Sequence, residues 1–152
     1  MLAAYHEAGH VVAAWLLGIP VESVEISHDG RGRTQLSLWY RSTSMFREVN
    51  QSTVRRDILF VLAGDCGEQL LFRFDERRTV DLDTYLAYVL SQRFRLDLYH
   101  LREEVGQMVV RQRDTIHALA RILYSHGKLN GFRLDLLRMD WLARGKTLFP
   151  RS

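Results

Sequence analysis

The sequence has a single cysteine and no apolar run of about 18 residues, the length that a membrane-spanning helix requires. The one thiol, that of Cys66, cannot form an internal disulfide, and lone cysteines behave most often as small buried hydrophobes. The sequence also shows no basic-then-apolar leader with a small-residue cleavage site. We therefore expect a cytoplasmic chain with no membrane span, either a naturally minimal protein or a piece of something longer.

Extremes of composition and charge are absent as well. Hydrophobic residues make up 47% of the chain and charged residues 26%, which excludes intrinsic disorder for the chain as a whole. The net charge of +3 comes largely from scattered arginines, which are typical of a solvated surface. No nucleic-acid-binding motif and no basic stripe accompany them, so we expect no nucleic-acid partner. The length suits one domain over residues 1–152.

The most informative stretch that is present is His6-Glu7-Ala8-Gly9-His10. At 3.6 residues per turn, positions four apart lie on the same helix face, so His6 and His10 can bind one metal ion. Glu7 would project beside the two imidazoles, where a carboxylate can accept the proton of an attacking water. This HExxH pattern is typical of zinc-dependent peptide hydrolysis.

The motif fixes only three positions, and an exposed helix can carry His and Glu at this spacing as a solvated face. Here the flanking residues 2–5 and 11–17 are mostly apolar, which indicates a buried helix and favours a metal site. Gly9 weakens a helix by roughly 1 kcal/mol relative to Ala. A glycine between two ligands therefore indicates that another element packs closely there.

Hydrophobic periodicity predicts a helix-dominated α+β fold with a small β-sheet. Alternating apolar and polar residues on either side of a glycine-containing turn predict a hairpin or two neighbouring strands. The strands are expected at residues 21–27 and 34–40, and the helices at 2–17, 52–72, 83–96, 98–125 and 133–142.

Two histidines do not complete a catalytic zinc site, which has three protein ligands and one open position. Spacing alone does not choose the third ligand. The candidates are Asp65, Glu68, Asp81, Asp83, His28, His100, His117 and His126.

Three segments together resemble the peptidase domain of the FtsH family of zinc metalloproteases. They are AYHEAGH at residues 4–10, the strand pair that begins at Pro20, and LAGDCGEQLLF at residues 62–72. The resemblance implies a zincin-like metallopeptidase fold that binds zinc and cleaves peptide bonds. Aligning the family's GAxxD element with residues 79–83 makes Asp83 the third ligand, and Asp81 is the alternative.

The resemblance also assigns roles to other residues. Glu68 matches the first glutamate of the family's AEE and would orient a ligand histidine, although it could instead pair with an arginine. As in the family, an edge strand would bind extended polypeptide substrates by strand addition. That strand comprises Thr34, Gln35, Leu36, Ser37 and Leu38.

Some features depart from the family. Asp65 stands where the family usually has arginine, and no GxxxxGK[ST] nucleotide-binding loop occurs. We therefore expect a stand-alone, ATP-independent endopeptidase that acts on unfolded or flexible polypeptides. A homo-oligomer, or a separate ATPase that unfolds substrates for it, is a candidate partner.

Two other classes of function compete with this prediction. The first is a catalytically idle zinc-binding regulator or adaptor of the same fold, although such a protein has no need for Glu7. The second is a helical interaction domain without metal, in which the amphipathic stretch 98–125 packs against a partner. Apolar stripes at this spacing are more often part of a core.

Overall fold

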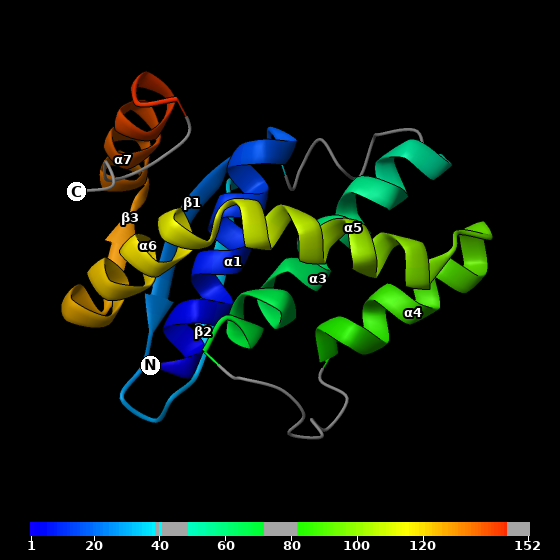
Figure 1. The fold of residues 1–152 in the computed structure, drawn as a ribbon, viewed down its shortest axis with the longest axis horizontal. Helices are drawn as coiled ribbons and strands as arrows, with labels where there is room; N and C mark the ends of the chain where they lie inside the picture. Colours follow the sequence, from blue (N-terminus) through cyan, green and yellow to red (C-terminus); the bar gives the residue numbers. More distant parts are fainter. Residues whose placement is uncertain (39, 41–48, 72–81, 146–152) are drawn as a thin grey trace.

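The structure is a computed structural model that describes residues 1–38, 40, 49–71 and 82–145. Mostly helical, with a small antiparallel sheet, it confirms the predicted α+β class. Figure 1 shows α1 in the middle, with α3, α4 and α5 on one side and β3 and α7 on the other. In chain order the elements are α1 (Leu2–Leu17), β1 (Val21–Ile26), β2 (Gly32–Leu36), α3 (Gln51–Gln69), α4 (Leu82–Phe94), α5 (Leu98–Arg111), α6 (Arg113–His126), β3 (Lys128–Asn130) and α7 (Gly131–Ala143).

Helix α1 is buried along most of its length and crosses α3 at very short range. A Cβ atom on Gly9 would lie 2.2 Å from the backbone oxygen of Ala63, and one on Gly67 would lie 2.6 Å from that of Tyr5. Glycine therefore allows the two backbones to touch, as the position of Gly9 in the motif predicted. This crossing brings α3 directly against the residues of the HExxH motif.

The sheet has the strand order β2-β1-β3, with both outer strands antiparallel to β1. In the register of the hairpin, Thr34 lies opposite Val24 and Gly32 lies opposite Ile26. Strand β2 is thus an edge strand, as predicted. The sequence did not predict β3, whose central residue Leu129 pairs with Val24 and is buried in the core.

The prediction of a strand up to Tyr40 was wrong at its end, because β2 stops at Leu36. The Ser37 hydroxyl oxygen accepts a hydrogen bond from the backbone N–H of Tyr40 at 3.2 Å, a contact typical of a helix N-cap. Leu38 and Tyr40 accordingly have helical backbone. Tyr40 is buried against Ala14, where a continuing strand would not have taken it.

The single helix predicted over 98–125 is in fact two helices, α5 and α6, which meet at Gln112. The side-chain oxygen of Gln112 accepts hydrogen bonds from the Thr115 hydroxyl and from Trp141 Nε1. The break lets α5 pack on α3 while α6 packs on α1. Apolar residues of both helices, among them Val105 and Leu119, are fully buried, so this stretch belongs to the core.

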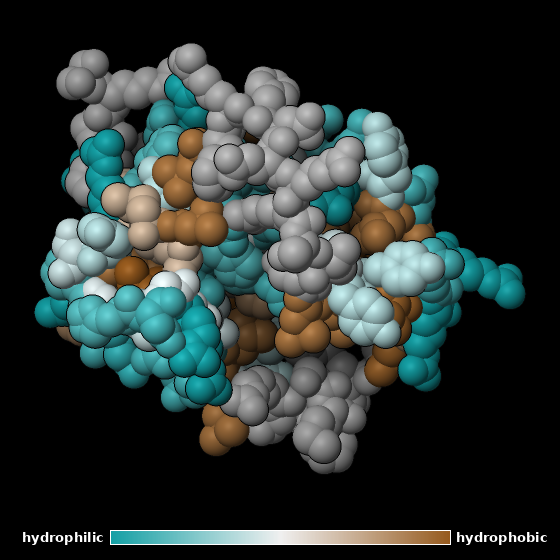
Figure 2. Space-filling model, turned by 90° about the horizontal axis from the view of Figure 1, so that it is seen from below, coloured by the Kyte–Doolittle hydropathy of each residue, from teal (hydrophilic) through white to brown (hydrophobic). Residues whose placement is uncertain are grey.

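One hydrophobic cluster joins α1 and α3 to α4, α5, α6 and α7, and Trp15 and Trp141 pack against each other within it. Cys66 is 4% exposed, as predicted, and burial raises the pKa of its thiol to about 11. Helix α4 contributes only Ala87 and Ser91 to the buried interior. Its other face adds apolar side chains to the surface seen from below (Figure 2). None of the described helices is both long and apolar enough to cross a membrane.

Candidate metal centre

His6 and His10 come from one face of α1, one turn apart, as the motif predicted. Their Nε2 atoms are 3.0 Å from each other, so the two imidazoles point toward a common centre. His10 is buried at 6% exposure, and His6 is partly buried. Both rings are held in this arrangement by hydrogen bonds from their Nδ1 atoms to groups on α3.

Asp83, in the first turn of α4, completes the group. Its Oδ2 atom is 3.2 Å from Nε2 of His6 and 3.1 Å from Nε2 of His10. A tetrahedral zinc ion with bonds of about 2.0–2.1 Å separates its ligand atoms by roughly 3.3 Å, so the three atoms are spaced as zinc ligands are. Within the described parts of the chain, these residues form the one group of histidines, cysteines or carboxylates suited to hold a metal ion. Asp81 lies outside the described residues.

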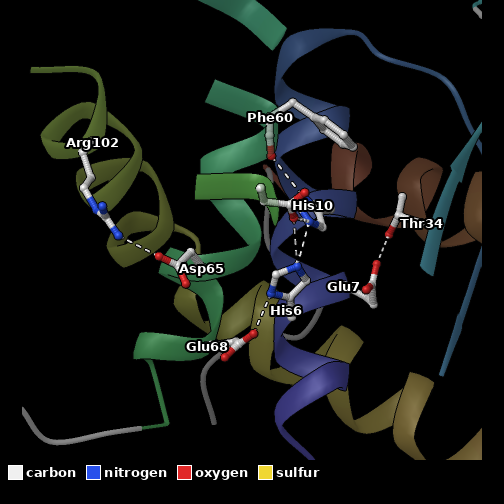
Figure 3. A network of polar contacts seen from close by, with 9 residues as sticks. His6, Glu7, His10, Thr34, Phe60, Asp65, Glu68 and Arg102 are labelled. Atoms are coloured by element: carbon white, nitrogen blue, oxygen red, sulfur yellow. Dashed lines mark hydrogen bonds and ion pairs between the residues drawn. The ribbon is translucent and has the colours of Figure 1, made fainter. Parts of the chain in front are cut away.

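The hydrogen-bond partner of Nδ1 in each ring determines whether the Nε2 atom of that ring can bind a metal ion (Figure 3). Nδ1 of His10 is 2.9 Å from the backbone oxygen of Phe60, which can only accept, so that Nδ1 carries a proton. Nδ1 of His6 donates in the same way to a carboxylate oxygen of Glu68 at 2.6 Å. In neutral rings both Nε2 atoms then present lone pairs, and these converge with the Asp83 carboxylate. Three electron-rich atoms this close require positive charge between them.

The protonation state of Asp83 suits the same role. Burial opposes ionisation of its carboxyl group, but when a proton rather than a metal ion lies between the groups, hydrogen bonds and positive charge from His10 and His6 outweigh burial and hold the pKa of Asp83 below its ordinary value. Its place in the first turn of α4 adds stabilisation, because helix N-termini favour negative charge. Asp83 is therefore an anionic oxygen donor at neutral pH.

Gly64 on α3 keeps the centre open. A Cβ atom at this position would lie 2.5 Å from Nε2 of His10 and 2.6 Å from Nε2 of His6. A larger residue would fill the space where the two nitrogens meet. Both the donor set and the room around it therefore fit a zinc ion.

Glu7 lies beside this group without belonging to it. Its side chain is 4% exposed, and one carboxylate oxygen, Oε2, accepts a hydrogen bond from the Thr34 hydroxyl at 2.6 Å. Figure 3 shows the carboxylate turned toward Thr34, on the side of α1 that faces β2. The structure thus places the Glu7 carboxylate on the side of α1 that faces the edge strand.

The remaining candidate ligands within the described residues do not join the centre. Asp65 points instead toward α5, where it pairs with Arg102 at 2.6 Å, and Nδ1 of His117 shares a hydrogen bond with the Tyr5 hydroxyl at 2.6 Å. His28 and His100 are exposed, and His126 bonds to the backbone of its own helix. Glu68 does not belong to the ligand group but contacts His6, as the resemblance implied.

Sequence reasoning missed three contributors to the site. These are the Phe60 carbonyl, the opening at Gly64 and the Thr34 hydroxyl. A backbone carbonyl leaves no trace in a sequence, since any residue supplies one. Gly64 stands out in the sequence only as a small residue inside a predicted helix, because nothing in the sequence shows that it lies beneath the histidines.

No model of a known protein family matches the chain, and a comparison with curated proteins finds no significant match.

Proposed function

We propose that this protein is a zinc-dependent endopeptidase of the zincin type, similar to the peptidase domain of the FtsH family. One observation carries the proposal. Two histidine lone pairs and the Asp83 carboxylate converge on one point, and Glu7, the neighbour of His6 on the same helix, carries a buried carboxylate. A structural zinc site is closed by four protein ligands, whereas three ligands with a neighbouring carboxylate are typical of a hydrolytic site.

Each residue of the site would have a distinct role in hydrolysis. His6, His10 and Asp83 would hold the zinc ion, while Glu68 and the Phe60 carbonyl keep the histidine rings in the required tautomer. Zinc, when bound, polarises the scissile carbonyl and makes water a nucleophile at neutral pH. Glu7 accepts the proton of the attacking water and then delivers it to the leaving amine.

The edge strand β2 supports an extended polypeptide as the substrate. Strand β2 pairs with β1 on one side and is the outermost strand of the sheet among the described residues, so its other edge is suited to strand addition. Backbone pairing would be nearly indifferent to side chains, which fits unfolded or flexible polypeptides. Because β2 ends at Leu36, the docking segment comprises Gly32–Leu36, and Ser37 and Leu38 lie beyond it.

The test compares the wild-type protein with Glu7→Gln. Both proteins should retain about one zinc per chain, since Glu7 is not a ligand, but only the wild type should cleave denatured casein without ATP. Phenanthroline should abolish the cleavage, and added zinc should restore it. Equal cleavage by both proteins would exclude Glu7 as the proton acceptor.

The same experiment addresses the idle adaptor. A wild-type protein that binds zinc and cleaves neither casein nor flexible peptides would be a zinc-binding regulator. A protein that binds no zinc would be the helical interaction domain.

A further inference from the structure

We propose that Thr34 is a positioning residue, which holds the Glu7 carboxylate in place for catalysis from the edge strand that receives the substrate. This inference rests on the proposed peptidase function and adds to it a residue that the HExxH motif does not contain.

The hydrogen bond between the two side chains has one possible direction. A carboxylate oxygen only accepts, so the Thr34 hydroxyl donates to Oε2 of Glu7 at 2.6 Å. Hydrogen bonds to an ionised group are roughly twice as strong as those between neutral groups. Glu7 is nearly inaccessible to solvent, so the threonine hydroxyl donates the hydrogen bond that water would donate to an exposed carboxylate.

Gly32 forms the second wall around Glu7. A Cβ atom on Gly32 would lie 2.5 Å from both Cγ and Oε1 of Glu7. Gly32 and Thr34 are two residues apart on β2 and therefore face the same side of the sheet. Gln35 lies on the opposite face, where its side chain bonds to Glu22. Strand β2 thus confines Glu7 with its backbone at Gly32 and with a hydroxyl at Thr34.

This arrangement links substrate docking to the position of the proton acceptor. A polypeptide added to the free edge of β2 would fix the strand, and the strand fixes Glu7. Binding energy used to position a catalytic group increases kcat rather than lowering KM. Loss of the Thr34 hydroxyl should therefore affect kcat.

The decisive variants are Thr34→Val, which removes the hydroxyl and keeps the shape, and Thr34→Ser, which keeps the hydroxyl. With a fluorogenic peptide, Thr34→Val should lower kcat about 10- to 100-fold, the scale expected when a catalytic group is misplaced by about 1 Å. Its KM should stay within about twofold of the wild type, and zinc content should not change. Thr34→Ser should restore most of the activity.

A matched control is Thr115→Val in α6. Thr115 is a buried threonine whose hydroxyl, like that of the half-buried Thr34, bonds to a side-chain oxygen, that of Gln112, but it lies outside the site. Its substitution should lower stability as Thr34→Val does and leave kcat unchanged. Loss of kcat in both variants would indicate a general structural effect and would overturn the proposal.

A crystal structure of Thr34→Val provides a readout independent of activity. The Glu7 carboxylate should move away from Gly32 or occupy several rotamers. An unchanged Glu7, or kcat equal to or above that of the wild type, would contradict the positioning role. If the zinc-loaded wild type cleaves nothing, the proposed function fails by itself, and the position of Glu7 in the crystal still decides whether Thr34 holds it.

Discussion

Nδ1 of His6 donates a hydrogen bond to Glu68 at 2.6 Å, which links the face of α1 that carries both histidines to α3. The carboxylate fixes the ring tautomer and increases the basicity of the Nε2 atom that faces the metal centre. Contacts of this kind typically change metal affinity 10- to 100-fold. We therefore predict that Glu68→Gln binds zinc about 10-fold more weakly or worse, as measured by competition with a chromogenic chelator.

Glu103→Gln serves as the control for that measurement. Glu103 is an exposed glutamate on α5, so its substitution changes the net charge equally without touching the metal centre. Equal zinc affinity of the two variants would show that Glu68 does not support His6.

The third ligand can be identified by zinc content. Asp83→Ala removes the carboxylate that lies within 3.2 Å of both histidine nitrogens, so the purified variant should contain little or no zinc. Asp81→Ala should retain about one equivalent. If only Asp81→Ala empties the site, the alignment with the family's GAxxD element is wrong by two residues.

Two glycines of α3 should respond differently to the same substitution. In Gly64→Ala the new methyl group meets the ends of His6 and His10, which can turn aside, so the fold should persist while zinc binding is lost. In Gly67→Ala the new methyl group meets the backbone of α1, which cannot move away without separating the two helices. Overpacking costs about 1–3 kcal/mol, and the helix propensity of Ala returns about 1 kcal/mol, so we expect a net loss of up to about 2 kcal/mol.

Urea unfolding and zinc titration of both glycine variants test this difference. Full zinc binding by Gly64→Ala would contradict the geometry of the centre, and unchanged stability of Gly67→Ala would contradict the close helix crossing.

His117 should make stability depend on pH. Burial, together with the positive charges of Arg121 and Arg113, lowers the pKa of His117 in the folded protein, and Asp114 opposes the shift. As pH falls below the ordinary value of about 6.5, the unfolded chain takes up the proton first, so the folded state loses stability. The loss should continue until the pH reaches the lower folded pKa.

Urea denaturation at pH 7.5 and pH 5.5 checks the pH effect. The free energy of unfolding should fall more in the wild type than in His117→Gln, because all other titrating groups are common to both proteins. An equal or larger fall in the variant would show that His117 does not have a depressed pKa.

Local sequence signals account for the parts of the fold that were predicted. The period of apolar residues located α1, and alternation on either side of a glycine-containing turn located the hairpin. Tertiary contacts account for what was missed. Strand β3 has only three residues, too few for a period, and it exists because Leu129 pairs with Val24 from a distant part of the chain. The break at Gln112 likewise depends on contacts with Trp141.

The residues of the candidate site likewise fall into those that local sequence predicts and those that depend on tertiary contacts. His6, Glu7 and His10 could be predicted because a helix fixes their relative positions within one turn. Asp83 is 73 residues from His10, and only the resemblance to a known family favoured it over other carboxylates. Thr34 was expected as part of the substrate strand. Its contact with Glu7 depends on how β2 packs against α1, which no local pattern encodes.

The most direct test of the central claim is anomalous X-ray diffraction at the zinc edge from crystals of the zinc-loaded protein. We predict a single peak about 2.0–2.2 Å from Nε2 of His6, Nε2 of His10 and a carboxylate oxygen of Asp83. Absence of a peak at this position, or side chains of these residues that point away from one another, would contradict the account.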